Sequence, residues 1–347
     1  MLIGLKKYLL LGRLNFWKKM MKTYNWGILG PGKIAKKFTE DLLQIPAARL
    51  HAVASRSEER AQAFAKMYGA KYAYNTYEAM LNCPELDVVY IASPHAGHYE
   101  HSLLFLNKGI PVLCEKPLAI NSRQVLAMIN AAKNKQTFFM EAIWTRYIPT
   151  MRKVLELIES GAIGDVLAVK ADFGFQAAFD PNSRLFDPKL GGGSLLDIGI
   201  YPAFLALLIL GKPERVEAMA HIGQTGVDEE CAVLMKYPNG KIAQLHSSIR
   251  FQTKTEAFIY GENGVIHMHT RWHEGKSISL LINGKRPKDF HFDYPERGYR
   301  FEAEEVMKCL GEGKTESPRL PLSFSKDLIE LLDLIRQKTG IVYPDYD

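Results

Sequence analysis

The sequence predicts an α/β N-terminal domain with a doubly wound parallel sheet, followed by an α+β domain with a large, mostly antiparallel open sheet. Between residues 24 and 141, short apolar runs alternate with helical patterns, which indicates repeated βαβ units. Between residues 216 and 281, strand-like segments follow one another with turn signals such as Pro238-Asn239-Gly240. With 347 residues, the chain is long enough for both domains.

The first domain, residues 22–141, is expected to hold parallel strands joined by right-handed crossovers. Each strand is recognised by a short apolar run, and each helix by apolar residues that recur at helical spacing. The strands are expected at 26–29, 50–54, 72–74, 87–92, 111–114 and 137–140, and the helices at 34–42, 58–68, 77–81, 96–108 and 121–134.

The second domain, residues 142–347, has a different texture, because its strands are not separated by regular helices. Its strands are expected to form an α+β domain with a mostly antiparallel sheet, and its last two helices are free to pack back on the first domain. The expected elements are a helix at 148–160, a strand at 166–175, an apolar helix ending near 210, strands within 216–281, and helices at 299–310 and 324–338.

The net charge of +6 is concentrated at the start of the chain. Six of the 44 basic residues lie within 1–22, which contains no acid, so the other 38 balance the 38 acidic residues. A nucleic-acid-binding domain carries its basic face on the folded part of the chain. We therefore expect no nucleic-acid partner.

Residues 1–21 are interpreted as an extension that is not part of the folded core. A basic amphipathic helix at a membrane surface is the alternative. No apolar stretch approaches the ~20 residues of a membrane span, so we expect no stable membrane association.

The cysteines are widely spaced and form no C-x-x-C pair, which is typical of reduced thiols and favours a cytoplasmic location. His95 and His98 have no partner at convincing metal-ligand spacing, so no metal site is expected. The cysteines are Cys83, Cys114, Cys231 and Cys309.

A glycine turn joins the first strand to the first helix and matches the G-x-G-x-x-[GA] pattern of Rossmann domains. Gly30 permits the tight turn, Gly32 leaves the backbone open to a pyrophosphate, and Ala35 lets the helix pack closely on the strand. The unpaired N–H groups at the helix start would face the phosphates. The alternative is an ordinary βα turn. The expected cofactor-binding residues here are Gly30, Pro31, Gly32, Lys33 and Ile34.

The end of the second strand decides which dinucleotide is preferred. An NAD site carries an acid there, whereas this chain has Ser55 and Arg56. An arginine can pair with a 2′-phosphate, so we expect NADP, with NAD as the alternative. Glu58 and Glu59 lie close by and weaken the argument.

Polar residues also follow the strands 87–92 and 111–114. Ligands of open α/β sheets bind beyond the carboxyl ends of the strands, so these residues should border the cofactor. A lysine at this edge can stabilise negative charge on a substrate oxygen, although a solvated surface lysine is the alternative. The residues concerned are Ser93, Pro94, His95, His98, Glu115 and Lys116.

Asp197 and Tyr201 follow a run of glycines at the start of the apolar helix. If this segment is helical, the two side chains lie on one face, but Pro202 suggests that the helix begins late. A neighbouring ammonium would lower the pKa of the tyrosine and prepare it for proton transfer. A core tyrosine beside a capping aspartate is an equal alternative.

These motifs together resemble the Gfo/Idh/MocA oxidoreductases over essentially residues 22–347, with Glu115-Lys116-Pro117 as the most specific element. Residues 140–146 and 199–201 are most similar to the branch that contains dimeric dihydrodiol dehydrogenase and NADP-dependent D-xylose dehydrogenase. Many relatives carry histidine in place of Tyr201, so an inositol dehydrogenase substrate is not carried over.

The resemblance implies a role for each matching position. Lys116 would contact the reacting oxygen, Tyr201 would be the general acid/base, and Asp197 would help to orient it. Trp144 and Arg146 would border the nicotinamide and the substrate. A homodimer through the open sheet of the second domain is also implied.

We therefore expect an NADP-dependent oxidoreductase that transfers hydride at a secondary alcohol or ketone of a sugar, polyol or cyclic diol. A non-catalytic dinucleotide sensor on the same fold is the alternative. Tyr299, just before a late helix, is a further candidate for the pocket.

Overall fold

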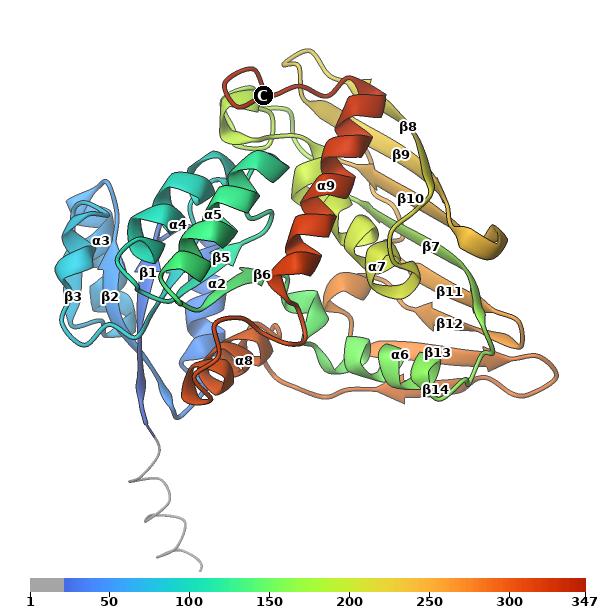
Figure 1. Cartoon of the computed structure of the whole chain (residues 1–347), viewed down its shortest axis with the longest axis horizontal. Helices are drawn as coiled ribbons and strands as arrows, with labels where there is room; N and C mark the ends of the chain where they lie inside the picture. Colours follow the sequence, from blue (N-terminus) through green and yellow to red (C-terminus); the bar gives the residue numbers. More distant parts are fainter. Residues whose placement is uncertain (1–21) are drawn as a thin grey trace, which may run out of the picture.

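The computed structural model describes residues 22–347, which form two sheets with helices packed against them (Figure 1). The first sheet is parallel throughout and has the order β3-β2-β1-β4-β5-β6, which confirms the doubly wound prediction. The order reverses between β1 and β4, where open sheets bind their ligands. The strands are β1 (Tyr24–Leu29), β2 (Ala48–Ala54), β3 (Tyr72–Tyr74), β4 (Val88–Ile91), β5 (Val112–Glu115) and β6 (Phe139–Ala142).

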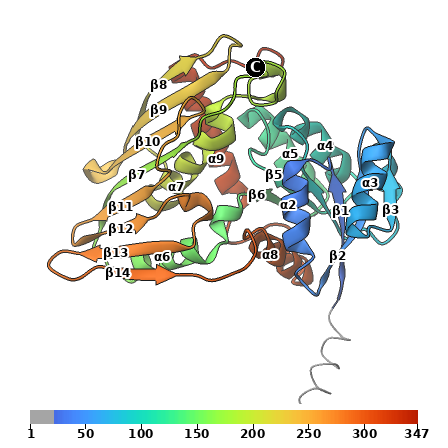
Figure 2. The same ribbon diagram turned by 180° about the vertical axis from the view of Figure 1, so that it is seen from behind.

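Helices cover both faces of this sheet. Helices α4 and α5 lie on the side nearer the viewer in Figure 1, whereas α2 is on the near side in Figure 2. Side-chain caps fix two helix starts: Ser57 accepts from the Arg60 N–H (3.3 Å), and Asn121 accepts from the Gln124 N–H (3.0 Å). The helices are α2 (Lys33–Leu42), α3 (Glu58–Tyr68), α4 (His98–Leu106) and α5 (Ser122–Asn134).

Three details of the first domain differ from expectation. The helix expected at 77–81 is a short 3-10 turn, Ala79–Asn82, because Pro84 disfavours helical backbone at the residue before it. The helix expected at 96–108 is divided into a 3-10 turn, His95–Gly97, and α4. Strand β6 ends at Ala142, so the boundary proposed at residue 141 falls inside a strand.

The second sheet has eight strands in the order β14-β13-β12-β11-β7-β10-β9-β8. Only β7 and β10 are parallel neighbours, so the prediction of a large, mostly antiparallel sheet is confirmed. Its strands are β7 (Val166–Gly174), β8 (Arg215–Ile222), β9 (Asp228–Lys236), β10 (Ile242–Ser248), β11 (Ala257–Gly261), β12 (Gly264–Met268), β13 (Ser277–Ile282) and β14 (Lys288–His291).

The helices of the second part of the chain lie on the face of this sheet that is turned toward the first domain, except Arg300–Gly311, which packs against α2 (Figures 1 and 2). Within residues 22–347, no helix covers the opposite face in either view. That face exposes apolar side chains, among them Leu234 at 49%, Ile242 at 41% and Tyr260 at 37%. The helices are α6 (Pro149–Glu159), α7 (Ile200–Leu210), α8 (Arg300–Gly311) and α9 (Leu322–Thr339).

The most apolar helical stretch, Pro188–Leu210, lies in the interior. It has a mean hydropathy of 1.9 and is long enough to cross a membrane, which corrects the expectation that no apolar stretch approaches that length. In the structure 83% of its most apolar window is buried, because α7 packs against β7, β10 and α9. Its composition is that of a core helix.

Just before α7, residues Leu195–Gly199 wind as a π-helix rather than a regular α-helix. The preceding Gly193 has φ +108°, and a Cβ there would lie 2.2 Å from Oδ1 of Asp228. That buried carboxylate accepts from the Ser194 hydroxyl and the Leu195 N–H, both at 2.7 Å. The wider turn of the π-helix and the backbone conformation of Gly193 together set the directions in which the side chains from Leu195 onward point.

The end of the chain packs against the first domain. Helix α9 lies between α5 and α7, and its Asp333 accepts from the Ser122 N–H at 2.8 Å (Figure 1). At the edge of β6, the Phe139 N–H donates to the Thr315 carbonyl at 3.0 Å. The first domain is therefore completed by residues from the other end of the sequence.

Of the remaining predictions, that for residues 1–21 lies outside the described residues. The four cysteines predicted to be reduced are free and buried. Within residues 22–347, no group of three or more potential ligands is placed to hold a metal ion.

Candidate active site

One cavity of about 810 Å³ collects nearly all of the predicted site residues. Its walls come from the carboxyl ends of the parallel strands and from four segments of the second domain. We call the part formed by residues 30–34 and 55–60 the cofactor half, and the part around Lys116, Asp197 and Tyr201 the reaction half. The predicted residues that line the cavity are Gly30, Pro31, Gly32, Lys33, Ile34, Ser55, Arg56, Ser93, Pro94, His95, His98, Glu115, Lys116, Trp144, Asp197 and Tyr201.

The glycine turn forms the floor of the cofactor half. Gly30 has φ +82°, and a Cβ there would lie 3.1 Å from the Ala92 carbonyl oxygen and the Ser93 nitrogen, so the turn packs tightly on the next strand end. At Gly32 a Cβ would meet only the Gly30 oxygen, 3.9 Å away. The free space over the start of α2 is the space that a pyrophosphate needs.

Two guanidinium groups line the outer end of the cofactor half, those of Arg56 and Arg60. Both residues are exposed and follow the end of β2, where the sequence predicts the contact to the adenosine ribose. Glu58, which weakened that prediction, accepts from Gln62 at 2.9 Å and does not line the cavity. Arg60 was not predicted as a cavity residue, although its place in the first turn of α3 could have indicated it.

The two histidines hold the strand-end loops in place. His98 is buried between the carbonyls of Pro117 (2.7 Å) and Ser93 (2.9 Å), and burial lowers its pKa to about 4. His95 faces the Gly191 carbonyl at 3.0 Å, and burial lowers its pKa well below the ordinary value. Burial therefore disfavours the charged form of both rings, whereas the two carbonyls that face His98 favour its charged form.

A charged cluster lies at the centre of the reaction half. The Lys116 ammonium donates to the Asp197 carbonyl and lies 3.6 Å from Oδ1 of the same residue. Arg184 contacts that oxygen at 3.1 Å. Burial alone would raise the pKa of Asp197, but the positive charges of Lys116 and Arg184 hold it well below its ordinary value. Asp197 is therefore an ionised carboxylate between two cations.

Tyr201 differs from the sequence expectation in its ionisation. The Lys116 ammonium lies 5.0 Å from the centre of the Tyr201 ring, over its face and not at its hydroxyl. Burial dominates and raises the pKa of Tyr201 well above its ordinary value, with Glu115 acting in the same direction. The expectation of a lowered pKa is wrong for this structure, and the hydroxyl is protonated at neutral pH.

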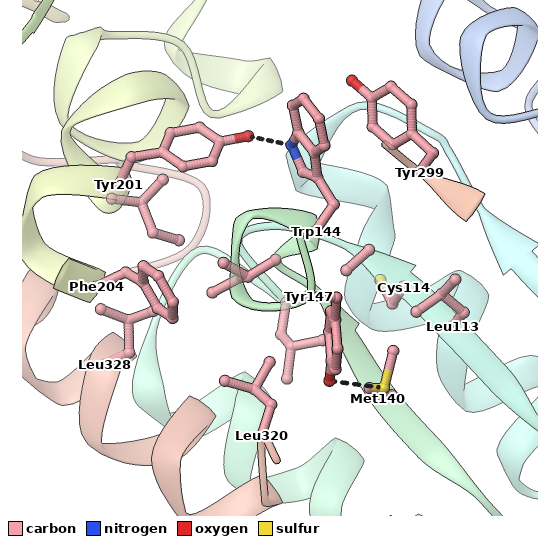
Figure 3. Packing of buried hydrophobic residues seen from close by; sticks show 14 of the residues in the cluster. Leu113, Cys114, Met140, Trp144, Tyr147, Tyr201, Phe204, Tyr299, Leu320 and Leu328 are labelled. Carbon is pink, nitrogen blue, oxygen red and sulfur yellow. Dashed lines mark hydrogen bonds between the residues drawn. The ribbon is translucent and has the colours of Figure 1, made fainter. Parts of the chain in front are cut away.

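Trp144 connects Tyr201 to the other aromatic wall (Figure 3). The indole Nε1–H donates to the Tyr201 hydroxyl at 3.1 Å. The other side of the indole stacks on the Tyr299 ring, with centroids 4.3 Å apart and an interplanar angle of 23°. The Tyr201 hydroxyl thus accepts a hydrogen bond from the indole N–H, and its own proton remains available to donate.

Arg146 is not brought into the cavity. Its Nε–H donates to the Arg319 carbonyl at 2.8 Å, beneath the cavity wall, and it does not line the cavity. The reason is local: Trp144–Arg146 form a 3-10 turn, so Trp144 and Arg146 point in different directions. The structure gives Arg146 a role in joining that turn to the segment before α9.

The cavity also contains residues for which the sequence carried no signal. Ser183, Arg184 and Leu185 come from the irregular stretch before the π-helix, and Tyr77 comes from the segment after β3. This irregular stretch shows neither a helical nor a strand pattern in the sequence. Its side chains could not be placed, because no periodicity fixes their direction.

A dinucleotide-type glycine turn opens onto a polar cluster that can move a proton and stabilise an oxyanion, which defines a nicotinamide-dependent oxidoreductase. Comparisons with known proteins agree. Residues 24–142 match the oxidoreductase family with an NAD-binding Rossmann fold, and residues 151–267 match the GFO/IDH/MocA C-terminal domain. The chain belongs to the Gfo/Idh/MocA family of oxidoreductases.

Curated relatives are similar over nearly their whole length. The trans-1,2-dihydrobenzene-1,2-diol dehydrogenase of Danio rerio is 38% identical over 332 residues, covering 92% of this chain and 97% of the relative. The Mus musculus enzyme of the same name is 36% identical over 92% and 98% of the two chains. The Homo sapiens enzyme is 34% identical with the same coverage.

Solved structures of lower identity share the fold. Aldose-aldose oxidoreductase from Caulobacter crescentus, complexed with glycerol, is 23% identical with a TM-score of 0.85, over 92% of this chain and 98% of that chain. Levoglucosan dehydrogenase in complex with NADH and levoglucosan is 21% identical with a TM-score of 0.83 and the same coverage. KijD10, a 3-ketoreductase from Actinomadura kijaniata in complex with NADP, is 24% identical with a TM-score of 0.81 and the same coverage.

Proposed function

We propose that this protein transfers hydride between NADP and a secondary alcohol or ketone of a cyclic diol, sugar or polyol. The observation that carries the proposal is the single cavity in which the glycine turn meets Lys116, Asp197 and Tyr201. The curated relatives, named for trans-1,2-dihydrobenzene-1,2-diol, make a cyclic trans-diol the first substrate to test.

The residues of the cofactor half fit a dinucleotide. The open space at Gly32 and the unpaired N–H groups at the start of α2 suit a pyrophosphate, which these groups would hold. When bound, NADP supplies the carbon that accepts or gives the hydride. Arg56 and Arg60 favour the 2′-phosphate, because both guanidiniums line the cavity end where an NAD site would carry an acid.

In the reaction half, Tyr201 would act as the general acid/base. Its protonated hydroxyl can donate to a carbonyl oxygen during reduction and must be deprotonated for oxidation. Lys116 would polarise the same oxygen, since its side chain is only 11% exposed and its charge is therefore weakly screened by solvent. Asp197 would hold the ammonium in place through the two contacts described above.

The first test is a fluorescence titration of the purified protein with NADPH and NADH. We expect micromolar binding of NADPH and about tenfold weaker binding of NADH. Equal binding would remove the specificity assigned to Arg56 and Arg60, and binding of neither would remove the whole proposal.

The second test is oxidation of trans-1,2-dihydrobenzene-1,2-diol with NADP, followed at the absorbance of NADPH, with D-xylose and glycerol as comparison substrates. Turnover of at least one of them is expected. Binding of NADPH without turnover of any diol, sugar or polyol would favour the alternative, a dinucleotide sensor.

A second copy of this chain is proposed as the partner of the uncovered sheet face. Leu234, Ile242 and Tyr260 place exposed apolar surface on a broad, flat sheet, which is the type of surface that protein interfaces cover. Light scattering should give twice the chain mass, and Ile242→Lys should give the single-chain mass. A single-chain mass for the unaltered protein would contradict the proposal.

A further inference from the structure

A buried carboxylate far from the reacting groups is connected to Tyr201 by a continuous series of contacts. Asp41 lies in the last turn of α2 and is 2% exposed. It is not a cavity residue, and nothing in its sequence surroundings marks it as functional. Its partners lie more than 250 positions away, in the loop that leads into α8.

The first contact joins α2 to that loop. Asp41 Oδ2 accepts from the Tyr299 N–H at 2.9 Å, and Oδ1 accepts from the Arg297 N–H at 3.3 Å. Because Tyr299 immediately precedes α8, the carboxylate acts as a cap supplied by another helix. Backbone donors on both oxygens fix the loop more closely than a contact to a flexible side chain would.

The second contact joins the loop to Trp144. Gly298 has φ +102°, and a Cβ there would lie 3.1 Å from Cγ2 of Ile148 and 3.5 Å from Cζ3 of Trp144. The next residue, Tyr299, stacks its ring on the indole at 4.3 Å. The loop held by Asp41 therefore forms the support on which the indole rests (Figure 3).

The third contact is the hydrogen bond from the indole Nε1–H to the Tyr201 hydroxyl, at 3.1 Å. We infer that Asp41 is a positioning residue: through Tyr299 and Trp144 it sets the position of the Tyr201 hydroxyl in the reaction half of the cavity. The inference rests on the proposed role of Tyr201 in proton transfer.

Helix α2 connects this series of contacts to the cofactor half of the cavity. Helix α2 begins at Lys33, beside the glycine turn, and carries Asp41 two turns later, roughly 12 Å along its axis. One rigid element thus holds the phosphate-binding backbone at one end and the support for the tyrosine at the other. The positions of the phosphate-binding turn and of the acid/base group therefore both depend on helix α2.

The test compares Asp41→Ala and Asp41→Asn with a matched control, Glu40→Gln. Glu40 is the neighbouring carboxylate on α2 and contacts the same loop, but through the exposed Arg297 side chain at 2.6 Å. We expect kcat for oxidation of the diol to fall about 10- to 100-fold in Asp41→Ala, with the KM for NADP within about threefold of wild type. Asp41→Asn keeps one acceptor oxygen and should recover part of the loss, and Glu40→Gln should match wild type.

A second measurement does not depend on activity. Fluorine NMR of the protein labelled with 5-fluorotryptophan reports the surroundings of Trp144, whose signal is assigned from Trp144→Phe. The signal should move in both Asp41 variants and in Tyr299→Leu, but not in Glu40→Gln. An unmoved signal in soluble Asp41→Asn, or a kcat within twofold of wild type in Asp41→Ala, overturns the inference. If the signal moves while no substrate is turned over, the positioning contacts stand and the proposed function fails.

Discussion

The two halves of the cavity are built in different ways. The cofactor half consists of backbone turns and exposed arginines from residues that are close together in the sequence. The reaction half consists of buried side chains from segments far apart, in which Lys116 and Asp197 are 81 positions from each other. In the proposed function, the first half would recognise a ligand through open space and unpaired N–H groups, and the second would act through charges held in fixed places.

If the two halves of the cavity act separately, substitutions in the reaction half should lower kcat the most and should leave cofactor binding intact. We expect Tyr201→Phe to lower kcat by about 10³-fold and Lys116→Ala by about 10²-fold or more, with the Kd for NADPH within threefold of wild type. Steady-state kinetics and fluorescence titration measure the two quantities. Tyr147→Phe is the matched control, because Tyr147 is equally buried but contacts Met140 at 3.1 Å outside the cavity (Figure 3). Near-wild-type turnover in Tyr201→Phe would remove the assignment.

The pH profile sharpens the same comparison. Burial raises the pKa of Tyr201, so the deprotonated form that oxidation requires is scarce at neutral pH. The kcat for diol oxidation should therefore rise with pH between 7 and 10, by up to about tenfold per unit, whereas reduction should be nearly constant. An oxidation rate that is already level at pH 7 would show that another group is the base.

The cofactor half should give a smaller and more selective effect. Arg56→Ala should raise the KM for NADPH by about 10-fold and leave that for NADH unchanged, because only NADPH carries the 2′-phosphate. Arg49→Ala is the control, since Arg49 is an exposed arginine at the other end of β2. Equal losses with both coenzymes would mean that Arg56 supports the fold and does not select the cofactor.

The smallest expected effect is on the unfolding free energy, and it concerns Asp228, which holds the start of the π-helix in the reaction half. Burial raises the pKa of Asp228 to about 7, so its folded form holds a proton that the unfolded chain releases near pH 4. Its stability contribution is complete below pH 4 and is lost as pH rises to about 7. Asp228→Asn cannot ionise, so it should gain roughly 1–3 kcal/mol in unfolding free energy over wild type between pH 5 and 8.

Urea unfolding at pH 5 and pH 8 measures this difference. The exposed Asp293→Asn is the control and should show no pH-dependent gain over wild type. A constant difference between Asp228→Asn and wild type at the two pH values would contradict the protonated carboxyl.

The contrast between the halves also explains what the sequence could predict. Gly30, Gly32 and Arg56 are placed by strand–turn–helix geometry, so their spacing alone leads to the correct cavity. The positions of Lys116 and Tyr201 follow from strand ends and the family motif, but the ionisation of Tyr201 depends on burial by Trp144 and its neighbours, which no local pattern records. Arg146 lies outside the cavity for a different, local reason: the direction of its side chain is decided within the single 3-10 turn Trp144–Arg146.

The contacts of Asp41 and Arg184 show more clearly what cannot be predicted from the sequence. Asp41 occupies a helical position with ordinary spacing, and its function depends on backbone N–H groups more than 250 residues later. Arg184 lies in an irregular loop whose shape depends on the glycines and on Asp228. Long-range contacts of this kind are set by packing, after the elements have formed.

The packing of the chain's end against the first domain has a consequence for the order of synthesis. Residues 22–142 leave the ribosome first, yet Ser122 and Phe139 find their partners only in Asp333 and Thr315. The Phe139 N–H stays without its partner for the next 176 residues of the chain, and the Ser122 N–H for the next 211. The first domain can collapse early, but it gains these two bonds only after Thr315 and Asp333 have been made.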